Sequence, residues 1–170
     1  VGIYTTSSAK QVKYVLDHAE CSGLILENAE QIEKWLDIRE SCPQVKWVIA
    51  IEPEGFDDVT RSLVSGQIEN NNRASGSLCD AIITKQPGDL TFPIMQRLCG
   101  SGIIVTDDEC LRAMALAYER LRVVIEPGGA AALAAALFHG DEIQGDAVIA
   151  VATGGNVDPA MFIRALEQHA

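Results

Sequence analysis

Apolar and polar residues alternate along the chain in blocks that predict strands and helices in turn. The apolar runs "GLILEN" (23–28) and "VKWVIAIE" (45–52) are typical of short buried strands. Between them, "NAEQIEKWLDIRESCP" places Ile32, Trp35 and Leu36 on one helical face and stops at Pro43. Residues 23–52 therefore predict a strand–helix–strand unit with parallel strands and a right-handed crossover.

The C-terminal part repeats this plan. "IIVT" predicts a strand, followed by a helix that opens with a capping box from Thr106 to Glu109. "RVVIEPGGAAALAAALF" and "DAVIAVATGGNVDPAMFIRALEQ" each predict a strand, a glycine turn and a helix, the second helix entered at Asp158-Pro159. The alternation predicts an α/β fold with three layers, a mostly parallel sheet and flanking helices.

The remaining segments carry weaker patterns. "SSAKQVKYVLDHAE" predicts a helix with a capping box from Ser8 to Gln11, and "GIY" predicts a short strand before it. Residues 65–77 are rich in Asn, Gly and Ser and predict a loop. "LCDAIIT" predicts a strand, and "TFPIMQRLCGSG" predicts a helix that ends at Gly100 or Gly102.

Composition excludes several classes of partner. The net charge of −11 argues against nucleic acid and anionic membranes, and no apolar run reaches the length of a membrane span. Five cysteines without paired spacing, and no recognisable signal peptide, predict a cytoplasmic protein with reduced thiols. The histidines His18, His139 and His169 show no metal-ligand spacing, and His18 and His169 are expected to be solvated on helix faces.

Two glycine turns are candidates for ligand contact. In "ATGGNVDPA" the glycines let backbone N–H groups approach an anion or a flat ring, with the Thr153 hydroxyl at the carboxyl end of the sheet. "IEPGGAAALAA" has the same architecture, with Glu126 at the end of the predicted strand. Tight turns that bind nothing use the same residues, and the residues alone favour this simpler interpretation.

"EPEGFDD" raises a second question. Glu52, Asp57 and Asp58 follow a strand, and such carboxylates suit Mg²⁺ or Ca²⁺ if the loop brings them together. The alternative is a helix N-terminus at which Asp side chains interact favourably with the helix dipole. The sequence alone favours the helix N-terminus.

Beyond residue 51 the chain resembles the C-terminal half of the catalytic domain of serine/threonine dehydratases. The motifs that carry the resemblance are "EPEGFDDVTRSLVSG", "CDAIITKQPGDLTFPI", "GIIVTDDECLRAMALAYERLRVVIEPGGAAALAAAL" and "VATGGNVDPAMFIRAL", which match in order and spacing. These dehydratases are fold-type II enzymes that use pyridoxal phosphate as cofactor. The resemblance therefore implies part of the fold-type II large domain.

The resemblance also assigns roles to individual residues. It implies that the turn of Thr153, Gly154, Gly155 and Asn156 binds the cofactor, with the Thr153 hydroxyl on the pyridine nitrogen where the family has Ser. Glu126 is implied to lie near the cofactor. Glu52, the carbonyl of Phe56, and Asp58 are implied to bind a divalent cation, Mg²⁺ or Ca²⁺.

Residues 1–50 instead resemble a segment of long-chain acyl-CoA synthetases, which belong to the adenylate-forming superfamily. The two resemblances meet at "IEPEG", since strands of both families end in a similar motif. We therefore expect a chimeric chain in which a synthetase-like segment (1–50) precedes a dehydratase-like segment (51–170), together forming one folded unit.

The expected chimera lacks the dehydratase segment that carries the Schiff-base lysine and the phosphate-binding loop. None of the five lysines follows a Gly- or Ser-rich loop before a helix. The first hypothesis is a homo-oligomer, a dimer, without catalysis of its own. The alternatives are a dehydratase component that is active only with a second chain, and a non-enzymatic module that binds a protein partner.

Overall fold

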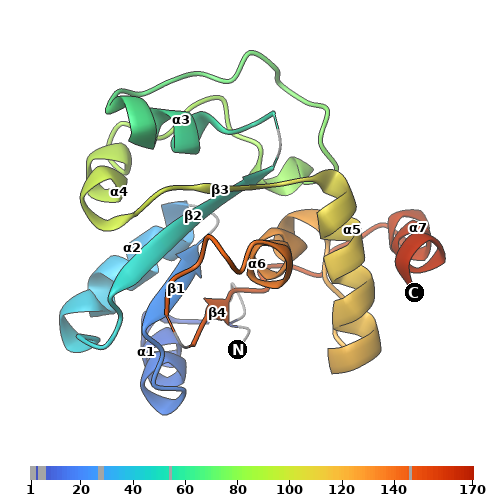
Figure 1. Cartoon of the computed structure of the whole chain (residues 1–170), viewed down its shortest axis with the longest axis horizontal. Helices are drawn as coiled ribbons and strands as arrows, with labels where there is room; N and C mark the ends of the chain where they lie inside the picture. The colour runs from blue at the N-terminus through green and yellow to red at the C-terminus, as the bar shows by residue number, and fades with distance from the viewer. Residues whose placement is uncertain (1–2, 4–6, 27–28, 54, 146) are drawn as a thin grey trace.

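The computed structural model describes residue 3 and residues 7–26, 29–53, 55–145 and 147–170. Within these residues, four parallel strands form one sheet: β1 (Gly23–Leu26), β2 (Trp47–Pro53), β3 (Ile103–Val105) and β4 (Ile149–Ala150). Their order across the sheet is β3-β2-β1-β4 (Figure 1). The expected α/β fold with a parallel sheet is confirmed, because every strand pairing among the described residues is parallel.

The predicted strand–helix–strand unit forms the middle of this sheet. β1 pairs with β2 from Gly23 opposite Trp47 to Leu26 opposite Ala50. The connection runs through α2 (Ala29–Ile38) and the short 3-10 helix η1 (Arg39–Ser41). Of the predicted face, Trp35 is buried and Leu36 is partly buried, while the side chain of Ile32 lies outside the described part of the chain; Ile38, which the pattern did not include, is also buried.

Helix α1 (Ala9–His18) precedes this unit and packs against α2. Its predicted capping box is confirmed: the Ser8 hydroxyl accepts from the Gln11 backbone N–H, and the Gln11 side chain accepts from the Ser8 N–H. Figure 1 shows α1 and α2 on one side of the strands, with the C-terminal helices on the other.

The C-terminal layer consists of α5 (Asp107–Leu116), the π-helical turn η3 (Ala117–Leu121), α6 (Pro127–Phe138) and α7 (Pro159–His169). Helix α6 contacts β2, β3 and β4 on its inner side and α5 on its outer side. Its alanines from Ala130 to Ala135 are completely buried, while Leu133 among them is partly buried. Small side chains let the α6 backbone lie close to both neighbours, since they occupy little space between the packed elements.

Helices α3 (Asp58–Ser65) and α4 (Phe92–Leu98) lie at the upper end of the view in Figure 1. Between them runs a long irregular segment, residues 66–91, that contains only the 3-10 helix η2 (Asp80–Ile82). The predicted loop over residues 66–77 is confirmed, while Ser65 still belongs to α3.

Two predicted strands differ from the structure, and a third lies mostly outside the described residues. Residues 78–84 form η2 and its flanks. Residues 122–126 have no regular structure, and the Glu126 N–H makes one backbone bond, to the Gly154 carbonyl, where a strand would make a ladder. In "GIY", Ile3 is not in a strand, while Gly2 and Tyr4 lie outside the described residues.

One expected exposure is wrong. The sequence predicts a solvated His169, but its side chain is only 16% exposed and its Nε2 lies 3.2 Å from a carboxylate oxygen of Asp108. The C-terminus of α7 therefore meets the N-terminus of α5. No helix among the described ranges is long and apolar enough to cross a bilayer.

Candidate functional site

The glycine turn after β4 lies at the carboxyl edge of the sheet. After Ala150 the chain continues through Val151 to Thr153, whose side chain is buried with a relative exposure of 7%. The chain then enters α7 with Asp158 as the N-cap, whose carboxylate accepts from the Ala160 N–H at 2.7 Å. Thr153 thus lies between the strand and the helix, where parallel α/β sheets bind their ligands.

The second predicted turn is in direct contact with the first. The Glu126 N–H donates to the carbonyl of Gly154 at 2.9 Å. A Cβ placed on Gly154 would collide with the Glu126 carboxylate, so the glutamate side chain lies on the surface of this glycine. The structure therefore brings together Glu126, which precedes α6, and Thr153 and Gly154, which follow β4.

Two further glycines make this close approach possible. A Cβ on Gly129 would lie 2.7 Å from the carbonyl oxygen of Gly154 and 2.8 Å from its nitrogen. A Cβ on Gly155 would lie 2.8 Å from the Val124 carbonyl oxygen. The sequence does not single out Gly129 for this contact, because its pattern predicts a turn before the helix, whereas Gly129 lies in the first turn of α6.

The surface of this site is open. Gly155 and Asn156 are exposed and Glu126 is partly exposed. The exposed backbone of Gly155 and Asn156 lies next to the buried Thr153, and this edge of the chain can contact a flat ring through its peptide groups.

The acidic motif "EPEGFDD" (52–58) leads into the N-terminus of helix α3. Asp57 is the N-cap residue of α3 and Asp58 its first residue, so the alternative of Asp residues at a helix N-terminus is confirmed. Asp58 is nearly fully buried, and its carboxylate accepts hydrogen bonds from the Asn71 amide and, at 3.1 Å, from the Thr84 hydroxyl. Asn71 also donates to the Thr84 carbonyl at 2.8 Å. The carboxylate therefore attaches the irregular segment to α3.

Arg61 extends this network toward the surface. Its guanidinium donates to Asp57 at 3.2 Å, to Glu69 at 2.9 Å and to the Asn71 side chain at 3.0 Å. Sequence reasoning missed Arg61, Asn71 and Thr84. The only signal was the run of asparagines at 70–72, which composition assigned to a loop.

These contacts do not favour a cation at the motif. Both oxygens of Asp58 accept bonds from protein donors, and Phe56 is buried. The side chain of Glu52 lies outside the described part of the chain. Within the part that is described, no group of three His, Cys, Asp or Glu side chains could hold a metal ion. The cation site at Glu52, Phe56 and Asp58 therefore stays a prediction.

An open pocket of about 680 Å³ lies beside this network. Its charged lining consists of the carboxylates of Asp57 and Asp107 and the guanidinium groups of Arg61 and Arg73. Asp107 is already engaged, since it accepts from the Ser77 hydroxyl at 2.6 Å and from the Leu78 N–H. The acidic network thus forms part of the wall of this pocket, and none of the residues of the glycine site lines it.

Comparison with known proteins identifies the class. The family model described as "Pyridoxal-phosphate dependent enzyme" matches residues 35–154. Serine racemase of Dictyostelium discoideum is 41% identical over 119 residues, which cover 68% of this chain and 36% of the racemase. L-threonine ammonia-lyase of Thermotoga maritima is 34% identical over 133 residues, which cover 77% of this chain and 32% of the lyase. The chain belongs to the family of pyridoxal-phosphate dependent enzymes.

Solved structures agree with this assignment. The threonine deaminase of T.th. superposes with a TM-score of 0.77 at 25% identity, over 88% of this chain and 52% of the deaminase. Maize serine racemase gives a TM-score of 0.79 at 27% identity, over 95% of this chain and 53% of the racemase. The fold is that of fold-type II enzymes. The chain spans about a third of the length of the curated relatives it matches.

These findings bear on residues 1–50. The family match begins at residue 35, ahead of the expected junction at "IEPEG", and the superposition on maize serine racemase covers 95% of the chain. The central β1–α2–β2 unit is therefore part of the fold that the relatives share. The comparisons give the resemblance to acyl-CoA synthetases no support.

The glycine site fits the ring of pyridoxal phosphate. The cofactor ring is flat and carries a nitrogen, and the site offers the hydroxyl of the buried Thr153 beside the exposed backbone of Gly155 and Asn156. Thr153 to Asn156 and Glu126 are the residues that would hold the ring.

Proposed function

We propose that these 170 residues form the part of a serine/threonine ammonia-lyase or racemase that binds the ring of pyridoxal phosphate. The observation that carries the proposal is the contact between the two turns. The Glu126 carboxylate occupies the position that a Cβ on Gly154 would take, and Gly129 packs against the Gly154 backbone. The named activities of the two curated relatives, serine racemase and L-threonine ammonia-lyase, support a hydroxy-amino acid as substrate.

The residues of the site would act on the cofactor as follows. Bound pyridoxal phosphate supplies an electron sink for negative charge at the α-carbon of an amino acid. The Thr153 hydroxyl would hydrogen bond the ring nitrogen, and because a hydroxyl is neutral it would leave that nitrogen largely unprotonated. The peptide groups of Gly154 and Gly155 would lie along the ring edge, and Glu126 would fix the position of that turn through its contact with Gly154.

Binding of the cofactor tests this assignment. Equilibrium dialysis with pyridoxal phosphate should detect binding to the wild type that is about fivefold weaker in Thr153→Val, since one hydrogen bond is lost without loss of volume. Thr91→Val is the matched control, because the Thr91 hydroxyl donates to the Gly88 carbonyl in the irregular segment and is absent from the site. Equal affinity of wild type and Thr153→Val would contradict the role of Thr153.

The 170-residue chain is further proposed to lack catalysis of its own. Among its lysines, Lys13 is engaged with Asp17 on the surface of α1, and Lys46 donates to the Pro43 carbonyl ahead of β2. β2 begins at Trp47, so Lys46 lies at the amino end of the strand, opposite to the glycine site. None of the five lysines follows a Gly- or Ser-rich loop before a helix, so borohydride treatment in the presence of the cofactor should give no adduct at a single lysine. A stoichiometric adduct, or ammonia release from L-serine, would favour a working dehydratase.

Chimeric origin is a separate part of the proposal. It rests on the shared "IEPEG" and on the residues before it, and it places a junction near residues 48–58. Sequencing the chromosomal locus across these codons tests it. An uninterrupted reading frame that encodes a glycine-rich loop and a lysine of the dehydratase type upstream would contradict a chimera.

Self-association is the last part of the proposal. Four large apolar residues near η3 and α7 are exposed to solvent. They are Tyr118 (38% exposed), Leu121 (64%), Val124 (44%) and Ile163 (53%). Tyr118 and the neighbouring Phe162 form an edge-to-face pair that joins η3 to α7, so these side chains belong to one region. Sedimentation equilibrium should show a dimer that Leu121→Asp weakens, and a monomer for the wild type would contradict self-association.

A further inference from the structure

Two cysteine thiols that belong to neither the glycine site nor the acidic network lie in contact with each other. The Sγ atoms of Cys79 and Cys110 are 3.5 Å apart and form a hydrogen bond, and both side chains are completely buried. They come from distant parts of the sequence: Cys79 ends the irregular stretch before η2, and Cys110 lies in the first turns of α5. A disulfide requires a sulfur–sulfur distance of about 2 Å, so the two sulfur atoms have to approach each other by about 1.5 Å for a bond to form.

The backbone around Cys79 is attached at both ends to the elements that carry Cys110 and the glycine site. The Cys79 N–H donates to the Ser77 hydroxyl at 3.0 Å, and that hydroxyl donates to Asp107 at the start of α5. On the other side, Ile82 of η2 would lie 3.4 Å from a Cβ on Gly128, in the first turn of α6. A bond between Cys79 and Cys110 would therefore hold η2 against both α5 and the turn that begins at Glu126.

The thiols are protected in the resting state. The hydrogen bond with Cys79 and burial raise the pKa of the Cys110 thiol far above its ordinary value, and the nearby carboxylates of Asp107 and Glu109 act in the same direction. Since the thiolate is the reactive form, the Cys110 thiol reacts only after the segment opens. A local opening would be enough to uncover Cys79, because residues 72–76 before it are exposed, and so are Asp80 and Ala81 after it.

We propose that Cys79 and Cys110 form a redox-sensitive pair, which a small-molecule disulfide such as oxidised glutathione converts into an intrachain disulfide. Cys79, as its thiolate, attacks one sulfur of the oxidant, forms a mixed disulfide and releases one thiol. Cys110 then loses its proton and attacks the Cys79 sulfur, which releases the second thiol. Two protein thiols are oxidised by two electrons, and one external disulfide is reduced to two thiols. The product fixes the segment Ser77–Ile82 to α5.

The test is peptide mapping of the full 170-residue chain after equilibration with glutathione buffers of increasing oxidised fraction. Free thiols are blocked with a maleimide, the chain is digested, and cross-linked peptides are identified by mass spectrometry. The expected result is a Cys79–Cys110 peptide whose yield rises with the oxidised fraction and which dithiothreitol removes. Glutathione attached to Cys79 without a cross-link, or full labelling of both thiols in the most oxidising buffer, would overturn the proposal.

Variants and hydrogen exchange make the result specific. Cys99→Ser should leave the cross-linked peptide unchanged, because Cys99 lies at the end of α4, while Cys79→Ala should abolish it. In the wild type, amide exchange over residues 77–82 should slow upon oxidation and return upon reduction. Unchanged exchange in a cross-linked sample would show that the bond does not constrain the segment and would overturn that part of the proposal. Cofactor affinity is not used, so the outcome does not depend on the proposed function.

Discussion

The interiors of the two halves of the molecule differ in the size of their buried side chains. Around β1, β2 and the helices α1 and α2, large side chains fill the core, including Leu16, Leu24, Trp35 and Ile38. Around α5, α6 and α7, the interior consists mainly of small side chains, with a row of alanines along α6. We call these the N-terminal core and the C-terminal core.

The difference follows from what each core has to position. In the N-terminal core, large side chains keep the helices at a distance from the sheet. None of the buried residues named above is a predicted ligand contact. The C-terminal core brings backbone next to backbone, so that the Glu126 turn and the Gly154 turn touch. The N-terminal core should therefore be damaged most by smaller residues, and the C-terminal core by larger ones.

The largest effect is expected for Leu24→Ala in the N-terminal core. Leu24 is completely buried on the central strand β1, between Val48 of β2 and Ile149 of β4. Loss of its side chain leaves a cavity that the flanking strands cannot close, and the free energy of unfolding should fall by about 3 kcal/mol. Urea denaturation measures the change. Leu90→Ala is the matched control, since Leu90 is 88% exposed, and a similar loss in both variants would contradict the cavity.

A somewhat smaller effect is expected for Gly129→Ala in the C-terminal core. The added methyl group would lie 2.7 Å from the Gly154 carbonyl oxygen, and the backbone of one turn has to move. Overpacking of this kind should lower the free energy of unfolding by about 2 kcal/mol. It should also weaken cofactor binding, which Leu24→Ala should affect less.

Gly140→Ala is the control for this variant, because nothing lies within 4 Å of a Cβ at Gly140. It should leave stability within about 0.5 kcal/mol of the wild type. If Gly129→Ala were equally harmless, the contact between the two turns would not be tight, and the contrast between the two cores would fail.

The two capping boxes allow the contribution of a partly buried helix cap to be compared with that of an exposed one. The Thr106 hydroxyl accepts from the Glu109 N–H at 3.1 Å in a partly buried setting, whereas the Ser8 hydroxyl accepts from Gln11 at 3.4 Å and is exposed to water. Thr106→Ala should therefore cost about 1 kcal/mol of unfolding free energy, and Ser8→Ala less. Urea denaturation of both variants checks the order, and the reverse order would show that burial of the cap does not decide its contribution.

Sequence predicted these local features well, and long-range contacts poorly. Both capping boxes and the Asp158 N-cap follow from residues within three positions of each other, so a single chain shows them directly. The strands β1, β2 and β3 follow from apolar runs in the same way. The resemblance to dehydratases predicted the family, which the family match confirms.

The rest depended on contacts that no local pattern contains. Asn71 reaches Asp58 across thirteen positions, and the asparagine run by itself indicates only a loop. The predicted strand at 78–84 instead contains the 3-10 helix η2, and the residues at its start, Ser77 and Leu78, bond to Asp107, which lies far along the chain. The closeness of Gly129 to Gly154 is likewise tertiary: the sequence placed both in glycine turns and could not bring the turns together.

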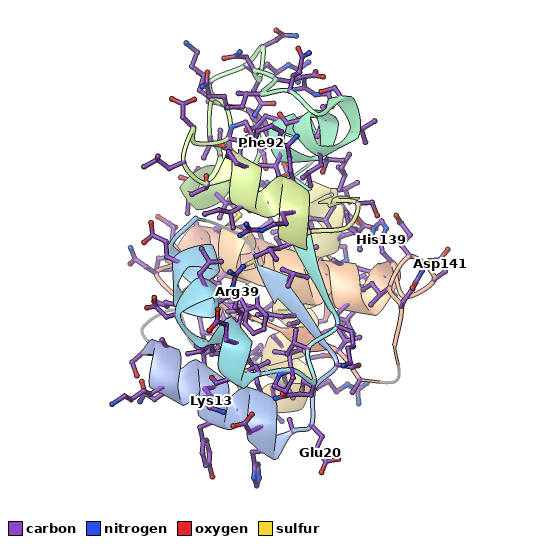
Figure 2. All side chains as sticks on the ribbon, turned by 90° about the vertical axis from the view of Figure 1, so that its left-hand side faces the viewer. Lys13, Glu20, Arg39, Phe92, His139 and Asp141 are labelled. Carbon is purple, nitrogen blue, oxygen red and sulfur yellow. The ribbon has the colours of Figure 1, made fainter. Side chains whose placement is uncertain are left out.

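The smallest effect expected concerns pH and the junction of helices in the C-terminal core. His139 follows α6 (Figure 2) and contacts Glu142 at 2.8 Å and Glu109 at 3.0 Å. Burial lowers the pKa of His139, but the hydrogen bond to Glu142 and the charge of Glu109 outweigh it, so the pKa is raised. Burial raises the pKa of Glu109, but hydrogen bonds with Thr106 and the charge of His139 lower it overall.

The signs of these shifts define a window of pH. A raised histidine pKa stabilises the fold fully below the unfolded value of about 6.5, and this contribution disappears as pH rises through the folded pKa. A lowered glutamate pKa stabilises the fold above about 4.5, and this contribution disappears as pH falls. Between about pH 5 and 6 both contributions are present, and toward about pH 8 the histidine contribution is lost.

The wild type should therefore lose up to about 1 kcal/mol relative to His139→Gln between about pH 6 and 8, as measured by urea denaturation at each pH. A parallel profile for His139→Gln would mean that the contact with Glu109 does not couple α6 to α5, and that the C-terminal core is held by its small-residue packing alone.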